Sequence, residues 1–304
     1  MSPWPKIPAD VIDWFRDLFG NANRSVSETF LNIPAIRETS LNDLLVQCMI
    51  PRSAPTRLAS GILVQVDVHN IGGLRRLMSW EVGDIAILVF VIHQNRIIAR
   101  KVAVLQAKRL YPSVGDIQDE DEVGFHYGMN FFLRRDESPS SMLLTRNYEF
   151  DENSTYGALR AGSKQQKVIK DFEVQFGSSI YYLLYNPPYI PLTVRHPVEC
   201  YRTLEREPPL GARVVQGAAI HELLSSWPEG RMPTLAEVTS VGTPAGGWRI
   251  EAWAADLLLT CREGSRYETP DEPRVRMLLE RRSGPIGAAI VVSIELPNSG
   301  MIDG

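Results

Sequence analysis

The sequence has few cysteines, no long apolar run and no excess of positive charge. Its three cysteines, Cys48, Cys200 and Cys261, are far apart and form no Cys-x-x-Cys pair, so they suggest neither a zinc site nor a disulfide framework. The longest apolar run, Ile85 to Ile92, is much shorter than the roughly 20 residues that cross a bilayer. The net charge of −4 means that any nucleic-acid partner must be bound by a local basic patch.

The composition is that of an ordinary folded protein. Hydrophobic residues make up 44% of the 304 positions and charged residues 22%, which is sufficient for a sizeable core in one large or two small domains. The first residues, Met-Ser-Pro-Trp-Pro-Lys, lack the charged-then-apolar layout of a signal peptide. We therefore expect a cytoplasmic protein with no membrane partner.

Polar residues interrupt an otherwise apolar pair of segments. Residues 84–92 and 97–105 are mostly apolar and flank the short polar turn His-Gln-Asn-Arg, which predicts a buried hairpin. At its open end the hairpin carries Asp84, Gln106 and Lys108, where a hydrophobic sheet would normally continue. Gln106 and Lys108 share a face because residues i and i+2 of a strand point the same way.

The register of this hairpin decides whether Asp84 joins them. With a turn centred on Asn95, opposed residues have numbers that sum to 190, and Asp84 then stands opposite Gln106 on the same face. A two-residue turn at Gln94 and Asn95 would instead pair Asp84 with Leu105, because a slip of one residue moves every side chain to the other face. We predict the first register.

The remaining pattern predicts an alternation of helices and strands. A short amphipathic helix is expected over residues 9–20, ended by Gly20, and a second over residues 37–49. Residues 61–69 alternate apolar and polar, which is typical of a strand with one polar face. The stretch 163–176 predicts a helix, and residues 180–185 predict a strand.

These elements suggest a division of the chain. Residues 1–30 form an N-terminal helix, and residues 31–190 form a core of helix, three strands, helix and strand, with a mixed sheet flanked by helices. Within it, residues 112–160 are an insertion, acidic and irregular at first. Residues 191–304 form a C-terminal α+β extension of unknown role, which the sequence allows to be either a second subdomain or a continuation of the same sheet.

The candidate catalytic and metal-binding residues are Glu38, Asp84, Gln106 and Lys108. Glu38 lies in the first turn of the 37–49 helix on the same face as its leucines, where an acid is costly unless something pairs with it. Oxygen ligands from acids and an amide suit Mg²⁺, and a lysine beside them stabilises charge on a phosphate. The set therefore points to metal-dependent phosphodiester cleavage.

This order of elements, with Glu, Asp and Gln-x-Lys, resembles the PD-(D/E)XK nuclease superfamily. Gly83-Asp84 followed by Gln-Ala-Lys-Arg resembles the catalytic domains of Mrr-type restriction endonucleases, in which glutamine replaces the usual glutamate. The resemblance implies that Asp84, Gln106 and Glu38 hold Mg²⁺ or Mn²⁺ and that Lys108 is the catalytic lysine. It covers about residues 30–190 and departs from the family in its single glycine before Asp84 and its long insertion.

The resemblance implies a metal-dependent endonuclease acting on nucleic acid, DNA in the first instance, in bacterial restriction or anti-phage defence. A protein partner or a homo-oligomer is compatible with it. One alternative is a catalytically inactive nuclease fold that binds nucleic acid or protein, since a neutral amide is a poorer Mg²⁺ ligand than a carboxylate. An unrelated α/β structural protein is another.

Several other residues stay open as contributors. Glu81 is a rival acid for Asp84, and Asp67 and His69 lie on the polar face of the 61–69 strand. The candidate contacts to nucleic acid are Lys164, Gln165, Arg75, Arg76, Arg100, Lys101, Arg134 and Arg135.

Overall fold

A computed structural model describes residues 3–70, 82–113, 146–176, 180–196, 198–269 and 286–297. The helices are α1 (Ala9–Asn32), α2 (Glu38–Gln47), the 3₁₀ helix η1 (Ile50–Arg52), α5 (Lys164–Phe176), α6 (Gly217–Ser225), α7 (Leu235–Thr239), α8 (Ile250–Ala252) and the π-helix η5 (Trp253–Leu258). The strands are β1 (Thr56–Arg57), β2 (Leu63–Asn70), β3 (Gly83–His93), β4 (Arg96–Arg109), β5 (Arg146–Phe150), β6 (Ile180–Tyr185), β7 (Leu192–His196), β8 (Arg213–Gln216), β9 (Trp248–Arg249), β10 (Ser265–Arg266) and β11 (Ile286–Glu295).

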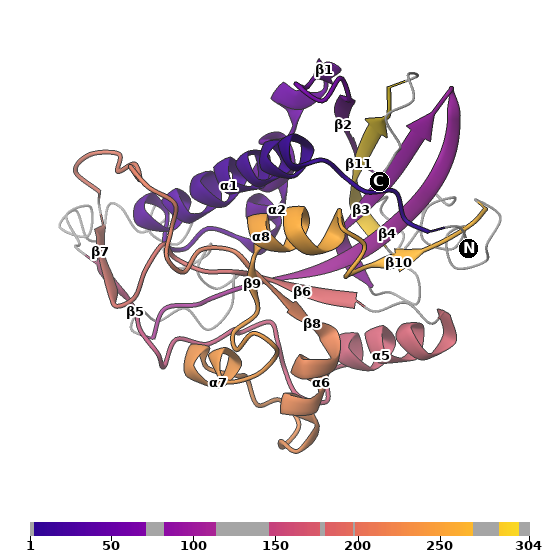
Figure 1. Cartoon of the computed structure of the whole chain (residues 1–304). Helices are drawn as coiled ribbons and strands as arrows, with labels where there is room; N and C mark the ends of the chain where they lie inside the picture. The colour runs from indigo at the N-terminus through magenta and orange to yellow at the C-terminus, as the bar shows by residue number, and fades with distance from the viewer. Residues whose placement is uncertain are drawn as a thin grey trace.

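Most of these strands form one mixed sheet. Its order is β1-β2-β11-β3-β4-β6-β8-β9, with β10 paired to β4, while β5 and β7 form a separate antiparallel pair. Figure 1 shows α1, α2 and α8 on one side of β6 and β8, and α5 and α6 on the other. The expected α/β class, with a mixed sheet flanked by helices, is confirmed.

The hairpin of β3 and β4 forms the centre of the sheet. Except near the turn, most side chains of both strands are buried on both faces, including Ile85 and Val89 on one face and Ala86 on the other at 0% exposure, as expected for strands covered by helices. The predicted strand with one polar face is also present, because Val64 and Val66 of β2 are fully buried while their neighbours are partly exposed.

The predicted register of this hairpin is confirmed, although the turn that produces it differs from the predicted one. Gln94 and Asn95 both have positive φ, 51° and 60°, which is typical of a two-residue turn. The register shifts between Val91 and Ile92, where one extra residue of β4 forms a β-bulge. Beyond the bulge Ile85 opposes Leu105, so the numbers sum to 190. The bulge therefore returns Asp84 to the face of Gln106.

The C-terminal strand β11 lies inside the sheet. It pairs antiparallel with β2 and parallel with β3, so it separates two strands that precede it in the chain. Strands β8, β9 and β10 belong to the same sheet. Of the two arrangements that the sequence allowed for residues 191–304, these strands have the second, a continuation of the sheet.

The first helix is much longer than predicted. Gly20 does not end it, and α1 continues to Asn32 because apolar residues recur at helical spacing beyond the glycine. Ala22, Val26 and Phe30, four residues apart, are all fully buried. No helix in the described part of the chain is both long and apolar enough to cross a membrane. Of the insertion predicted at 112–160, residues 114–145 lie outside the described residues.

Gly83, which begins β3, leaves no room for a side chain. A Cβ there would lie 2.3 Å from Val104 Cγ1 and 3.3 Å from Leu105 O. We expect Gly83→Ala to lower the free energy of unfolding by about 1–3 kcal/mol, as overpacking does in other cores. Urea denaturation measures it. Gly20→Ala is the control, because its Cβ meets only the flexible Glu207 Oε1 at 3.3 Å and alanine favours a helix. Equal losses in the two variants would contradict the packing argument.

Candidate functional site

The four predicted residues meet where β4 continues past the start of β3. Asp84 Oδ2 accepts a hydrogen bond from the backbone N–H of Ala107 at 2.7 Å and another from Gln106 Nε2. These contacts hold the carboxylate against the edge of β4 that β3 leaves open. Asp84 and Gln106 therefore lie side by side, as the register requires.

Glu38 reaches the same edge from the first turn of α2. Its Oε1 accepts from Lys108 Nζ at 3.1 Å, and its Oε2 accepts from the backbone N–H of Arg109 at 3.1 Å. The amides of Ala107 and Arg109 are two residues apart, so they are separated by about 6.6 Å along the strand. Two carboxylates, contributed by a helix and a strand, thus lie next to each other along one strand edge.

Gln106 carries an unsatisfied buried oxygen. The residue is 1% exposed, and its Nε2 faces two acceptors, Asp84 Oδ2 and Ala107 O, the latter at 3.4 Å. This fixes the orientation of the amide and leaves Oε1 buried without a hydrogen-bond partner. A buried acceptor without a donor costs about 1–3 kcal/mol, so a cationic partner is the kind of ligand that it lacks.

The oxygen atoms of Asp84 and Gln106 are suitable ligands for a hard divalent cation. Asp84 supplies carboxylate oxygen and Gln106 supplies amide oxygen, both of which Mg²⁺ and Mn²⁺ accept. The described residues contain no cluster of three or more His, Cys, Asp or Glu side chains that would hold a metal by themselves. A cation here would depend on the amide as well as on the acids.

Lys108 is buried, contrary to the expectation for a lysine at a strand end. Its side chain is 3% exposed and that of Glu38 is 15% exposed. The ion pair explains this, since a lysine is almost never buried unless it is paired. The pair also satisfies the requirement that the acid on the core side of α2 should have a partner.

Arg109, Tyr185 and Asn42 are structural parts of the site that the sequence reasoning did not identify. Arg109 is 1% exposed, and its guanidinium donates to the carbonyl oxygens of Pro34, at 3.1 Å, and Ile36. Tyr185 at the end of β6 donates to Asn42 Oδ1 at 2.8 Å. The start of α2 is thereby fixed to both β4 and β6. The position of Arg109 directly after Lys108 was a possible signal for its role.

The Tyr185 hydroxyl lies in the field of three acidic groups. Burial raises the pKa of the Tyr185 hydroxyl well above its ordinary value, and the negative charges of Asp84, Glu38 and Asp43 raise it further. The hydroxyl therefore stays protonated, as a donor to Asn42 must be.

The other candidate residues lie elsewhere or outside the described residues. Glu81, Arg75, Arg76, Arg134 and Arg135 are among those outside. Lys101 is not an exposed phosphate contact, because it is fully buried and its Nζ donates to Leu258 O at 2.8 Å. Arg100 donates to Glu268 O at 2.6 Å. Asp67 accepts from Gln65 on its own strand, and Lys164 is exposed on α5.

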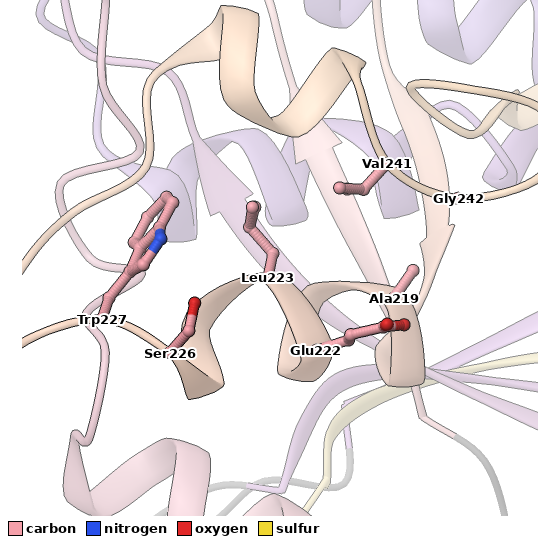
Figure 2. Close-up of a pocket in the computed structure, with 7 residues that line it drawn as sticks. All are labelled: Ala219, Glu222, Leu223, Ser226, Trp227, Val241 and Gly242. Atoms are coloured by element: carbon pink, nitrogen blue, oxygen red, sulfur yellow. The ribbon is translucent and has the colours of Figure 1, made fainter.

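Two concavities lie away from these four residues. One, of about 330 Å³, is drawn in Figure 2; α6 supplies Glu222 and Leu223, and Trp227 and Val241 come from the segments that follow α6 and α7. The other, of about 580 Å³, lies between α2, η1 and β2 and includes Asp43. Neither is lined by Glu38, Asp84, Gln106 or Lys108.

Arg109 gives a direct test of how α2 is held. We expect Arg109→Lys to lower the free energy of unfolding by about 2–4 kcal/mol, because lysine lacks the planar fork whose two terminal nitrogens each reach one carbonyl, and a buried unsatisfied carbonyl costs about 1–3 kcal/mol. Urea denaturation measures the loss. Exposed Arg160→Lys is the matched control and should change stability by less than about 0.5 kcal/mol. Equal stability of Arg109→Lys and the wild type would contradict this role.

Comparisons with protein-family models, with curated proteins and with solved structures found no match.

Proposed function

We propose that this protein is a metal-dependent nuclease that hydrolyses phosphodiester bonds, with DNA as its substrate, and that its sheet contains a restriction-endonuclease-like core. The observation that supports this most is the meeting of Glu38, Asp84, Gln106 and Lys108 at one strand edge, although Glu38 and Lys108 are 70 residues apart. Among the described residues, the elements of the main sheet and its helices run from α2 through β2, β3 and β4 to α5 and β6, an order that agrees with this core once η1 and the two-residue β1 are set aside; β5 lies between β4 and α5 but belongs to the separate pair with β7. In this chain β11 lies between β2 and β3, so the three strands of the proposed core are not all neighbours in the sheet.

Each residue has a part in the proposed chemistry. Asp84 and Gln106 would hold Mg²⁺ or Mn²⁺, which would polarise a phosphate oxygen and lower the pKa of a bound water so that it is more readily deprotonated for attack. Lys108 carries the positive charge that stabilises the more anionic transition state. Because its ammonium group is paired with Glu38, its direction is fixed before the substrate arrives.

The proposed biological setting is the one that the family resemblance implies. A nuclease of this kind would act on DNA in the bacterial cytoplasm, in restriction or in defence against phage. Neither a membrane nor a lipid has a part in this chemistry.

A second candidate is an inactive nuclease fold that binds nucleic acid. The burial of Lys108 favours it, since a 3% exposed ammonium group already paired with Glu38 has little surface to offer a phosphate. The neutral amide of Gln106 favours it too, because it adds no charge to attract a cation.

A plasmid assay separates the two functions. Supercoiled plasmid is incubated with purified protein in Mg²⁺, in Mn²⁺ and in excess EDTA, and binding of a labelled duplex is measured in Ca²⁺. Cleavage in Mg²⁺ or Mn²⁺ that EDTA stops is the expected result. Binding without cleavage in any metal favours the second candidate, and absence of both contradicts both functions.

A further inference from the structure

We propose that Glu38 is a positioning residue for Lys108 and that the divalent cation is held by Asp84 and Gln106 without it. This inference rests on the proposed function and corrects the set implied by the family resemblance, in which Glu38 is a third metal ligand. Both Glu38 oxygens already accept hydrogen bonds, one from Lys108 Nζ and one from Arg109 N–H, each at 3.1 Å. A carboxylate held at both oxygens in this way orients the lysine.

The helix that carries Glu38 is not free to turn it toward a cation. Arg109 holds the segment before α2 through the carbonyl oxygens of Pro34 and Ile36, and its own backbone N–H holds Glu38. One turn further along α2, Asn42 is held by the buried hydroxyl of Tyr185. The helix is thus fixed on both sides of Glu38, by groups that are themselves buried.

The two proposed metal ligands, Asp84 and Gln106, together carry little negative charge. Asp84 contributes one negative charge and Gln106 none, while the charge of Glu38 is balanced by Lys108. Cation affinity in oxygen sites rises with the number of charged ligands. The pair should therefore bind a divalent cation weakly by itself and much more tightly when a substrate phosphate adds its own anionic oxygens, so that metal and DNA bind together.

The first test measures metal binding directly and needs no catalysis. Free Mn²⁺ is counted by electron paramagnetic resonance as it is added to the purified protein, with and without a phosphorothioate duplex that resists cleavage. The duplex is expected to raise the Mn²⁺ affinity about tenfold or more. The double variant Glu38→Gln/Lys108→Gln removes one charge of each sign, so its Mn²⁺ affinity without DNA should stay within about threefold of the wild type.

Variants of the two ligands complete the metal test. Gln106→Glu adds a carboxylate to the pair and should raise Mn²⁺ affinity without DNA by about tenfold or more. Asp84→Asn should lower it by about tenfold or more. A loss of tenfold or more in Glu38→Gln/Lys108→Gln would overturn the inference, because Glu38 would then be a ligand. No effect of Gln106→Glu would overturn it as well.

The second test concerns the positioning role. Because Glu38 acts through Lys108, Glu38→Gln should slow single-turnover cleavage about tenfold in the wild type and leave the residual rate unchanged in the Lys108→Gln background. Equal slowing in both backgrounds would mean a general structural role and would overturn the inference. If the wild type bound no Mn²⁺ with or without DNA and cut no plasmid, the proposed function would fail too. Loss of binding in the double variant alone would overturn only the role of Glu38.

Discussion

Replacement of Asp84 by asparagine is expected to abolish metal-dependent cleavage while the protein stays folded. Asparagine has nearly the same shape and keeps an oxygen that can accept from the Ala107 N–H, at present 2.7 Å from Asp84 Oδ2. It removes the only carboxylate that we assign to the cation, and such a cation contributes several kcal/mol to transition-state stabilisation. The initial rate of plasmid cleavage in Mg²⁺ should therefore fall on the order of 10³-fold or more.

Two control variants make this result specific. Asp67→Asn changes an acid on the polar face of β2 and should leave the rate within about twofold of the wild type, as a surface charge change does. Glu81→Gln tests the rival acid near the start of β3. Full activity of Asp84→Asn together with an inactive Glu81→Gln would show that the wrong acid had been assigned.

Replacement of Lys108 by alanine is expected to slow cleavage on the order of 10²–10³-fold, the usual effect of losing one charge-stabilising donor. The substitution should also reduce stability, because it leaves Glu38 without its cation at a site where the Lys108 side chain is only 3% exposed. Breaking a buried pair costs about 3–5 kcal/mol, and the partial exposure of Glu38 reduces this to about 1–3 kcal/mol. Single-turnover cleavage and urea denaturation measure the two effects.

Lys167→Ala is the matched control for this substitution. Lys167 is exposed on α5, so its loss removes the same charge without a buried partner. Its cleavage rate and stability should match those of the wild type. If Lys108→Ala cut plasmid as fast as Lys167→Ala, Lys108 would have no part in the chemistry.

The existence of the central hairpin could be predicted from its sequence, although two registers were open. Two apolar segments joined by a short polar turn allow few arrangements, and the position of Asp84 relative to Gln106 depends only on register. The register was right, but the bulge near Ile98 could not be foreseen. Ile98 is chemically like its neighbours, and nothing in the sequence marks the one residue that is left without a partner.

The environment of Lys108 and Arg109 could not be predicted from local sequence. Two consecutive cations at the end of a strand normally indicate solvent, yet their exposures are 3% and 1%. Their partners are Glu38 in α2 and two carbonyl oxygens in the segment before α2, about 70 residues earlier in the chain. The position of β11 in the sheet could not be predicted either, because its neighbours β2 and β3 are far away in the sequence. An apolar strand can pair with many others, and its local sequence pattern does not determine which.

The place of β11 also determines when the protein can become active during its synthesis. Gly287 of β11 lies so close to β3 that a Cβ there would be 2.9 Å from Asp84 O. Strand β11 therefore packs directly against the backbone of Asp84, the proposed metal ligand. Ribosomes add about 5–20 residues per second, which leaves an interval of roughly 10–40 s between the synthesis of β3 and that of β11. Throughout that interval the strand that pairs with both β2 and β3 beside Asp84 has not yet been made. A chain released early would lack the support of this strand, and the proposed nuclease would acquire its catalytic geometry only after β11 has been synthesised.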